Sequence, residues 1–126
     1  MTDAHPQRLG QAVWHDLTVN DAGALRDFYQ AVCGWTAEPH DMGDYVDYTM
    51  KTADGAVAAG ICHARGANAA LPPVWLCYVT VASLSDAMAE VRRRGGRIID
   101  ERLQDGAGFA VIEDPAGAVL ALWQPG

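Results

Sequence analysis

Residues 12–19 (AVWHDLTV) are the first patterned segment of the chain, an apolar run rich in strand-forming residues in which His15 and Asp16 are adjacent. Gly10 and the Asn20-Asp21 pair bound the run, and this pattern predicts a β-strand. From Asp21 the period changes, because Leu25, Phe28, Tyr29 and Val32 recur three and four residues apart. That spacing is typical of a helix with one packed side. Asp21 can cap this helix, and Gly34 can end it.

Three further strands are expected after this helix, at residues 35–38, 45–51 and 56–63. The last two are joined by Ala53-Asp54-Gly55, which is a hairpin signal. Residues 64–73 (ARGANAALPP) are small and rich in turn formers, and we interpret them as a linker.

The same order of elements starts again at residue 74. A strand is expected at 74–81, and a helix begins at Ser83 and ends at Gly95-Gly96. Three strands follow, at residues 97–101, 108–113 and 118–123. The turn between the last two is Asp114-Pro115-Ala116-Gly117.

One spacing relates the two halves: the two helix starts, the two helix ends and the two last hairpin turns each lie 62 residues apart. The pairs are Asp21 and Ser83, Gly34 and Gly96, and Gly55 and Gly117. Such an internal repeat indicates an α+β fold of two βαβββ units. We expect the units to form one curved mixed sheet within one structural domain, with the helices on the convex face and a ligand cleft on the concave face. The predicted segments are a flexible leader (1–11), a first unit (12–63), the linker (64–73) and a second unit (74–126).

The composition of the chain argues against several classes of function. The chain has 126 residues, half of them hydrophobic, and a formal net charge of −7, which argues against nucleic-acid binding through a positive field. No apolar run is long enough to span a membrane, and residues 1–10 lack the apolar core of a signal peptide. The three cysteines form no CxxC pair, so we expect half-buried thiols and no disulfides. These features predict a cytoplasmic protein.

The chain resembles the vicinal oxygen chelate superfamily, which includes glyoxalase I, the bleomycin resistance proteins and the extradiol dioxygenases. Within it, the chain is most similar to a glyoxalase-like group of undefined activity. The resemblance implies paired βαβββ units, a cleft on the concave sheet and, as in many members, a homodimer. The residues that carry it are Trp14-His15-Asp16-Leu17, Asp21, Phe28-Tyr29, Gly34-Trp35, Gly95-Gly96 and Asp114-Pro115-Ala116-Gly117.

Metal-using members of the superfamily carry a His, Gln or Glu at four strand positions, and the cation polarises substrate oxygens. The matching positions here hold side chains that cannot coordinate a metal, namely Trp14, Ala59, Leu76 and Ala121. We therefore expect no metal and no other cofactor, and a divalent metal is the alternative.

Two histidines are the candidates for such a metal. His15 lies one residue from a ligand position, so strand alternation turns it under the helix, with Leu17 and Val19. There we expect a structural, hydrogen-bonded histidine unless a bulge intervenes. His63 lies at a strand end, where an exposed histidine is expected.

The concave face is expected to hold a small-molecule ligand among aromatic and polar side chains. Asp16 is the most informative of these, since aspartate is depleted in strands. Burial between aromatic rings would raise its pKa and suit a general acid/base, but a ligand contact or a structural role is also open. The predicted ligand-binding residues are Trp14, Asp16, Thr18, Trp75, Tyr78, Phe109 and Trp123.

These observations predict a small-molecule-binding protein with an aromatic cavity and without the superfamily's metal. An acidic chain that binds without reacting, as drug-sequestering resistance proteins do, would favour a cationic ligand. The alternatives are a metal-dependent lyase or dioxygenase, a metal-free enzyme that uses Asp16, and a pure interaction module.

Overall fold

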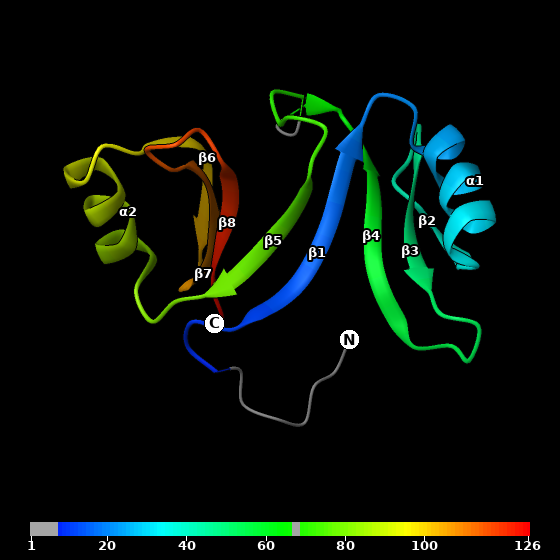
Figure 1. Cartoon of the computed structure of the whole chain (residues 1–126), viewed down its shortest axis with the longest axis horizontal. Coiled ribbons are helices and arrows are strands. Elements are labelled where there is room, and N and C mark those ends of the chain that lie inside the picture. Colours follow the sequence, from blue (N-terminus) through cyan, green and yellow to red (C-terminus); the bar gives the residue numbers. More distant parts are fainter. Residues whose placement is uncertain (1–7, 67–68) are drawn as a thin grey trace. The chain divides into compact units, whose positions relative to one another are not determined.

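The computed structural model describes residues 8–66 and 69–126, and within them it has eight strands and two helices (Figure 1). Every predicted element is present, and the ends differ from the prediction by at most three residues. The elements are β1 (Ala12–Val19), α1 (Ala22–Cys33), β2 (Thr36–Asp41), β3 (Val46–Lys51), β4 (Val57–His63), β5 (Trp75–Thr80), α2 (Leu84–Arg93), β6 (Arg97–Gln104), β7 (Ala107–Glu113) and β8 (Val119–Gln124).

The described part of the chain divides into two compact units. Unit 1 is His15–Trp75, and unit 2 combines residues 8–14 with Leu76–Gly126. The division therefore passes through β1 after Trp14 and through β5 after Trp75. Each unit contains one helix beside its own strands (Figure 1).

In unit 1 the strands are ordered β2-β3-β4-β1. β1 and β4 are parallel, and the other two pairs are antiparallel. The core lies between α1 and the sheet, where Ala22, Met50 and Ile61 are completely buried. Burial of such side chains is the main stabilising term of the unit.

Unit 2 repeats this arrangement with the order β5-β8-β7-β6, in which β5 and β8 are parallel. Leu84 and Met88 of α2 pack on Ala110, Ile112 and Leu122 of the sheet. The two βαβββ units and their mixed strand pairing confirm the predicted α+β fold. The ligand cleft and the proposed segment boundaries stay predictions.

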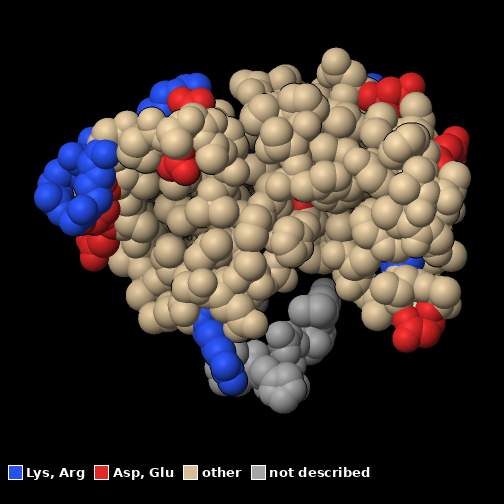
Figure 2. Space-filling view, viewed as in Figure 1, with Lys and Arg blue, Asp and Glu red and all other residues tan. Residues whose placement is uncertain are grey.

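Both helices are capped as the sequence predicts. The Asp21 carboxylate accepts a hydrogen bond from the amide of Ala24 (3.0 Å), and the Ser83 hydroxyl accepts one from the amide of Asp86 (3.2 Å). Gly34 ends α1 with a positive φ of 72°. Figure 2 shows basic side chains gathered at the end of α2, where they face the negative end of the helix dipole.

The repeat breaks in β4, which contains one residue more than β8. Met50 pairs with Ala59 and Lys51 with Val57, so Ala58 has no partner on β3 and forms a β-bulge. The corresponding pairing of β7 with β8 has no bulge. The second part of β4 is therefore shifted by one residue: Gly60 pairs with Asp16, whereas Ala121 pairs with Tyr78.

Candidate functional site

In unit 1, the sheet face away from α1 is polar. Met50 and Ile61 pack beneath α1, so strand alternation turns their neighbours to the opposite face. The parallel and antiparallel pairs bring the same-facing residues of β1, β3 and β4 together. They include Asp16, Thr18, Asp47, Thr49, Gly60 and Cys62. The alternation of β1 thus places Asp16 and Thr18 on the face that the sequence predicts for them.

Carboxylates dominate the electrostatics of this face. Burial raises the pKa of the Cys62 thiol to about 12, and the charges of Asp16 and Asp47 add to the effect. A thiol with such a pKa is neutral at physiological pH, so Cys62 is not a nucleophile there. The face therefore offers negative charge and hydrogen-bond acceptors rather than a reactive sulfur.

Asp47 also holds the end of β4. One of its carboxylate oxygens accepts a hydrogen bond from the amide of His63 (2.8 Å) and lies 3.5 Å from Nδ1 of the same residue. The His63 ring packs edge-on against Tyr45, with ring centroids 5.7 Å apart. His63, expected to be exposed, is partly buried, with 18% of its side chain accessible.

In unit 2, the corresponding face is aromatic. Ala110, Ile112 and Leu122 pack against α2, so the residues between them face away from it. Phe109 lies directly opposite Trp123, and its ring contacts Tyr78 with the centroids 6.2 Å apart. All three rings are partly exposed. The structure thus brings three of the predicted ligand-binding residues onto one surface.

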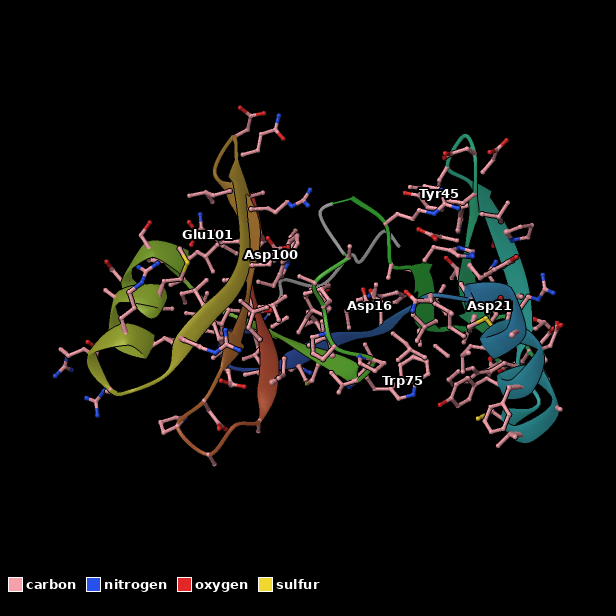
Figure 3. All side chains as sticks on the ribbon, turned by 90° about the horizontal axis from the view of Figure 1, so that it is seen from above. Asp16, Asp21, Tyr45, Trp75, Asp100 and Glu101 are labelled. Carbon is pink, nitrogen blue, oxygen red and sulfur yellow. The ribbon has the colours of Figure 1, made fainter. Side chains whose placement is uncertain are left out.

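Trp75 does not belong to the aromatic face of unit 2, because it packs beside α1 in unit 1. Its indole N–H donates a hydrogen bond to the hydroxyl oxygen of Tyr29 (3.1 Å), and its ring packs against Tyr29 and Trp35. Figure 3 shows Trp75 among the aromatic side chains beside α1, away from Asp16. Trp14 lies two residues before Asp16 but belongs to unit 2.

A pocket of about 330 Å³ lies on the helix side of unit 1. His15 is on this side, as strand alternation predicts, but its side chain is exposed rather than covered by the helix. Ala59 also lines the pocket, so the expectation that Ala59 faces the concave side is wrong, and the Ala58 bulge is the reason. The lining residues are His15, Tyr29, Cys33, Trp35, Ala58, Ala59 and Trp75.

The cysteines are free, in agreement with the sequence. Cys62 and Cys77 are partly buried, but Cys33 at the end of α1 is exposed, so the expectation of three half-buried thiols is wrong for Cys33. No helix in the described ranges is long and apolar enough to cross a membrane.

The donor set does not fit the metal that the superfamily resemblance implies. With the bulge taken into account, the position equivalent to Ala121 is Gly60, which has no side chain at all. Trp14 and Leu76 hold the two first-strand positions and also lack a suitable donor. Within residues 8–66 and 69–126, no three His, Cys, Asp or Glu side chains form a group that could hold a metal ion.

Comparisons with known proteins agree with the architecture. The model of the glyoxalase-like domain family matches residues 12–123. CFP32 of Mycobacterium tuberculosis, a proposed glyoxylase, is 32% identical over 121 residues, which cover 93% of this chain and 46% of that protein. The anthracycline biosynthesis protein DnrV of Streptomyces peucetius is 28% identical over 131 residues, covering 93% and 48%. The chain spans about half the length of these relatives.

Solved structures share the fold at low identity. A glyoxalase/bleomycin resistance protein/dioxygenase superfamily member from Vibrio splendidus matches with a TM-score of 0.57 and 13% identity, covering 89% of this chain and 97% of that chain. Methylmalonyl-CoA epimerase of Streptomyces coelicolor, in complex with 2-nitronate-propionyl-CoA, matches with a TM-score of 0.53 and 18% identity, covering 93% and 98%.

Proposed function

Because the chain belongs to the glyoxalase-like domain family, we propose that it is a small-molecule-binding protein that acts without the metal of the wider superfamily. The observation that carries this proposal is the carboxylate-bearing sheet face of unit 1, where Gly60 stands opposite Asp16. Gly60 has no side chain, so it supplies no metal ligand beside Asp16. Asp16 is the residue proposed to contact the ligand.

The negative charge of this face indicates the charge of its ligand. Asp16 and Asp47 lie near enough to Cys62 to raise its pKa, so both carboxylates act on the same small region. Two neighbouring carboxylates favour a ligand that carries positive charge or several hydrogen-bond donors. The ligand is therefore proposed to be a small organic cation, held without reaction, as in drug-sequestering proteins.

The names of the relatives agree with this class of function. One is a proposed glyoxylase and another is an anthracycline biosynthesis protein, and both names refer to chemistry on small organic molecules. A methylmalonyl-CoA epimerase with the same fold binds a CoA ester. Since the chain covers about half of the curated relatives, their whole activities are not transferred to it.

Binding of two charged probes tests the proposal. Benzylammonium and benzoate are titrated into ¹⁵N-labelled protein, and amide shifts are followed by NMR. Benzylammonium is expected to shift amides of β1, β3 and β4, and benzoate is expected not to. Asp16→Asn should weaken benzylammonium binding by about tenfold or more, the worth of a charge-assisted hydrogen bond. Asp105→Asn is the matched control, because Asp105 is exposed, lies in unit 2 and has a positive φ that asparagine tolerates.

The metal content of the purified protein distinguishes a metal-free binding protein from a metal-dependent enzyme. Protein purified with added Zn²⁺, Ni²⁺, Fe²⁺ or Mn²⁺ and then desalted is analysed by mass spectrometry for bound ions. The proposal expects less than stoichiometric metal. A stoichiometric ion that is lost in His15→Ala or His63→Ala would overturn it and favour a metal-dependent lyase or dioxygenase. Equal binding of the two organic probes would contradict the proposed role of Asp16.

A further inference from the structure

The pocket on the helix side of unit 1 has no part in the proposed function. It has a volume of about 330 Å³, and its surface is almost entirely apolar. Three of its lining residues are Tyr29, Trp35 and Trp75, whose side chains are only partly buried and so present accessible rings. Small-molecule sites have volumes of about 300–1,000 Å³ and mostly apolar walls. The pocket therefore has the size and the surface of a binding site.

The three aromatic rings are held in place by one another. The indole N–H of Trp75 donates a hydrogen bond to the hydroxyl oxygen of Tyr29 (3.1 Å), and their ring centroids lie 5.2 Å apart. The centroid of Trp35 lies 6.0 Å from that of each of the other two rings. Because these contacts exist without a ligand, the walls are already formed and a ligand need not order them.

Two small residues of β4 leave room beside the rings. Ala58, the unpaired residue of the β-bulge, is partly exposed and lines the pocket. Ala59 also lines it and pairs with Met50, which is completely buried. A longer side chain at Ala58 would extend into the space in which the pocket lies.

The lining also restricts the charge of a ligand. No Asp, Glu, Lys or Arg is among the described residues that line this pocket. The pocket on the helix side of unit 2, of about 300 Å³, differs because Glu90, Arg94 and Asp114 line it. A charge that loses water without gaining a partner is costly. The pocket of unit 1 thus favours a neutral molecule.

We propose that the helix-side pocket of unit 1 is a second ligand site, which binds a small neutral aromatic molecule. The rings of Tyr29, Trp35 and Trp75 pack against the ring of the ligand, edge-on or offset. The site does not depend on the proposed function, because it lies on the other side of the sheet from Asp16. The adjacent residue His15 lines the pocket, whereas Asp16 faces away from it.

The test compares two probes that share one ring system, 2-naphthol, which is neutral at neutral pH, and 2-naphthoate, which is an anion. Both are titrated into ¹⁵N-labelled protein, with NMR dissociation constants as the readout. Wild type is expected to bind 2-naphthol about tenfold or more tightly than 2-naphthoate, with amide shifts at the end of α1 and the start of β4.

Three variants locate the binding. Ala58→Leu fills the pocket and should weaken 2-naphthol binding about tenfold or more, whereas Ala58→Ser keeps it open and should retain binding. Ala87→Leu is the matched control, because Ala87 lines the pocket of unit 2 and is also partly exposed. It should leave the affinity for 2-naphthol unchanged. Thermal unfolding verifies that each variant folds.

Cys33 provides a second readout that needs no variant. Its thiol is exposed and lines the pocket, so saturating 2-naphthol should slow its alkylation by iodoacetamide in wild type. Mass spectrometry follows this reaction, and saturating 2-naphthoate should protect much less.

Four outcomes overturn the proposal: no binding of 2-naphthol, equal binding of both probes, undiminished binding by folded Ala58→Leu, or an unprotected Cys33. Protection of Cys33 that rises with protein concentration and needs no probe also overturns it, since the pocket would then be a contact between copies of the chain. The benzylammonium titration independently decides the proposed function at Asp16.

Discussion

The two units have the same order of elements, a side-chain cap at the equivalent start of each helix and the same side of the sheet packed against that helix, yet their other sheet faces differ in chemistry. In unit 1 that face carries Asp16, Asp47 and Cys62, and in unit 2 it carries aromatic rings and Asp100. A residue under a helix must fit a packed core, which restricts its size and polarity. The other faces are partly buried as well, since Thr18, Val111 and Ala121 are almost or completely buried, but they do not pack against the helix of their unit. The repeated scaffold can therefore support two different surfaces.

The bulge at Ala58 adds to this difference. Because of it, Cys62 occupies the place in unit 1 that Trp123 occupies in unit 2, each paired with a threonine of the parallel strand, Thr18 or Thr80. A thiol therefore replaces a large ring, and Gly60 replaces Ala121. One additional residue has changed what the second half of β4 presents on both of its faces.

Single-residue deletions give the largest expected contrast between the units. Deleting Ala58 removes only the unpaired residue, so β4 keeps its pairs, and the free energy of unfolding should change by about 1 kcal/mol or less. Deleting Ala121 from the regular β8 turns Leu122 out of the core and should cost more than about 3 kcal/mol. Chemical denaturation measures both. Equal destabilisation by the two deletions would contradict the assignment of Ala58 as the unpaired residue of a β-bulge.

Thiol reactivity provides the next contrast, inside unit 1. Raising the pKa of Cys62 from 9.0 to about 12 lowers its thiolate fraction at pH 8 about a thousandfold. Cys33 is exposed, so iodoacetamide should label Cys33 and leave Cys62 unmodified in the folded protein. Labelling of Cys62 should rise with pH, and it should be faster in Asp16→Asn, which removes one of the charges that disfavour the thiolate. Mass spectrometry measures the labelling. Equal labelling of both cysteines at pH 8 would contradict the burial of Cys62, and unchanged labelling of Cys62 in Asp16→Asn would contradict the acidic face.

The sequence predicted most of this scaffold because each element has a local signal. The alternation in β1 placed His15 and Asp16 on opposite faces, and Asp21, Gly34 and Ser83 marked the helix ends. The bulge had no such signal, since Val57-Ala58-Ala59-Gly60 allows either register. The register is decided by pairing with β3, a contact that no local pattern reveals.

The same limitation applies to the candidate site. The register shift in β6 has no local signal either, because the adjacent residues Ile98 and Ile99 are both apolar and hide the face to which Asp100 belongs. Trp75 was predicted among the ligand-binding residues of the concave face, and in the structure it packs with Tyr29 and Trp35 beside α1. Aromatic residues suit both a core and a binding site, so their sequence alone does not distinguish the two.

A core substitution sharpens the comparison of the helices. Leu84 at the start of α2 stands where Ala22 stands in α1, and both are completely buried. Leu84→Ala gives unit 2 the residue of unit 1 but leaves a cavity above Ala110, Ile112 and Leu122. We expect a loss of about 2–5 kcal/mol in the free energy of unfolding. A loss below 1 kcal/mol in urea denaturation would show that α2 can move into the space, and so that its packing is less defined than it looks.

The helix caps give the smallest effect and test where the two units are equivalent. Asp21 and Ser83 lie 62 residues apart, and each accepts a hydrogen bond from an amide in the first turn of its helix. Removal of such a cap costs about 1 kcal/mol, so Asp21→Ala and Ser83→Ala should destabilise the chain by similar amounts. Urea denaturation of the two variants and of the double variant measures this, and the two effects should add because the caps share no contacts. A much larger cost at Asp21 would mean that its carboxylate does more than cap α1, and the units would then differ on their helix sides as well as on their open sheet faces.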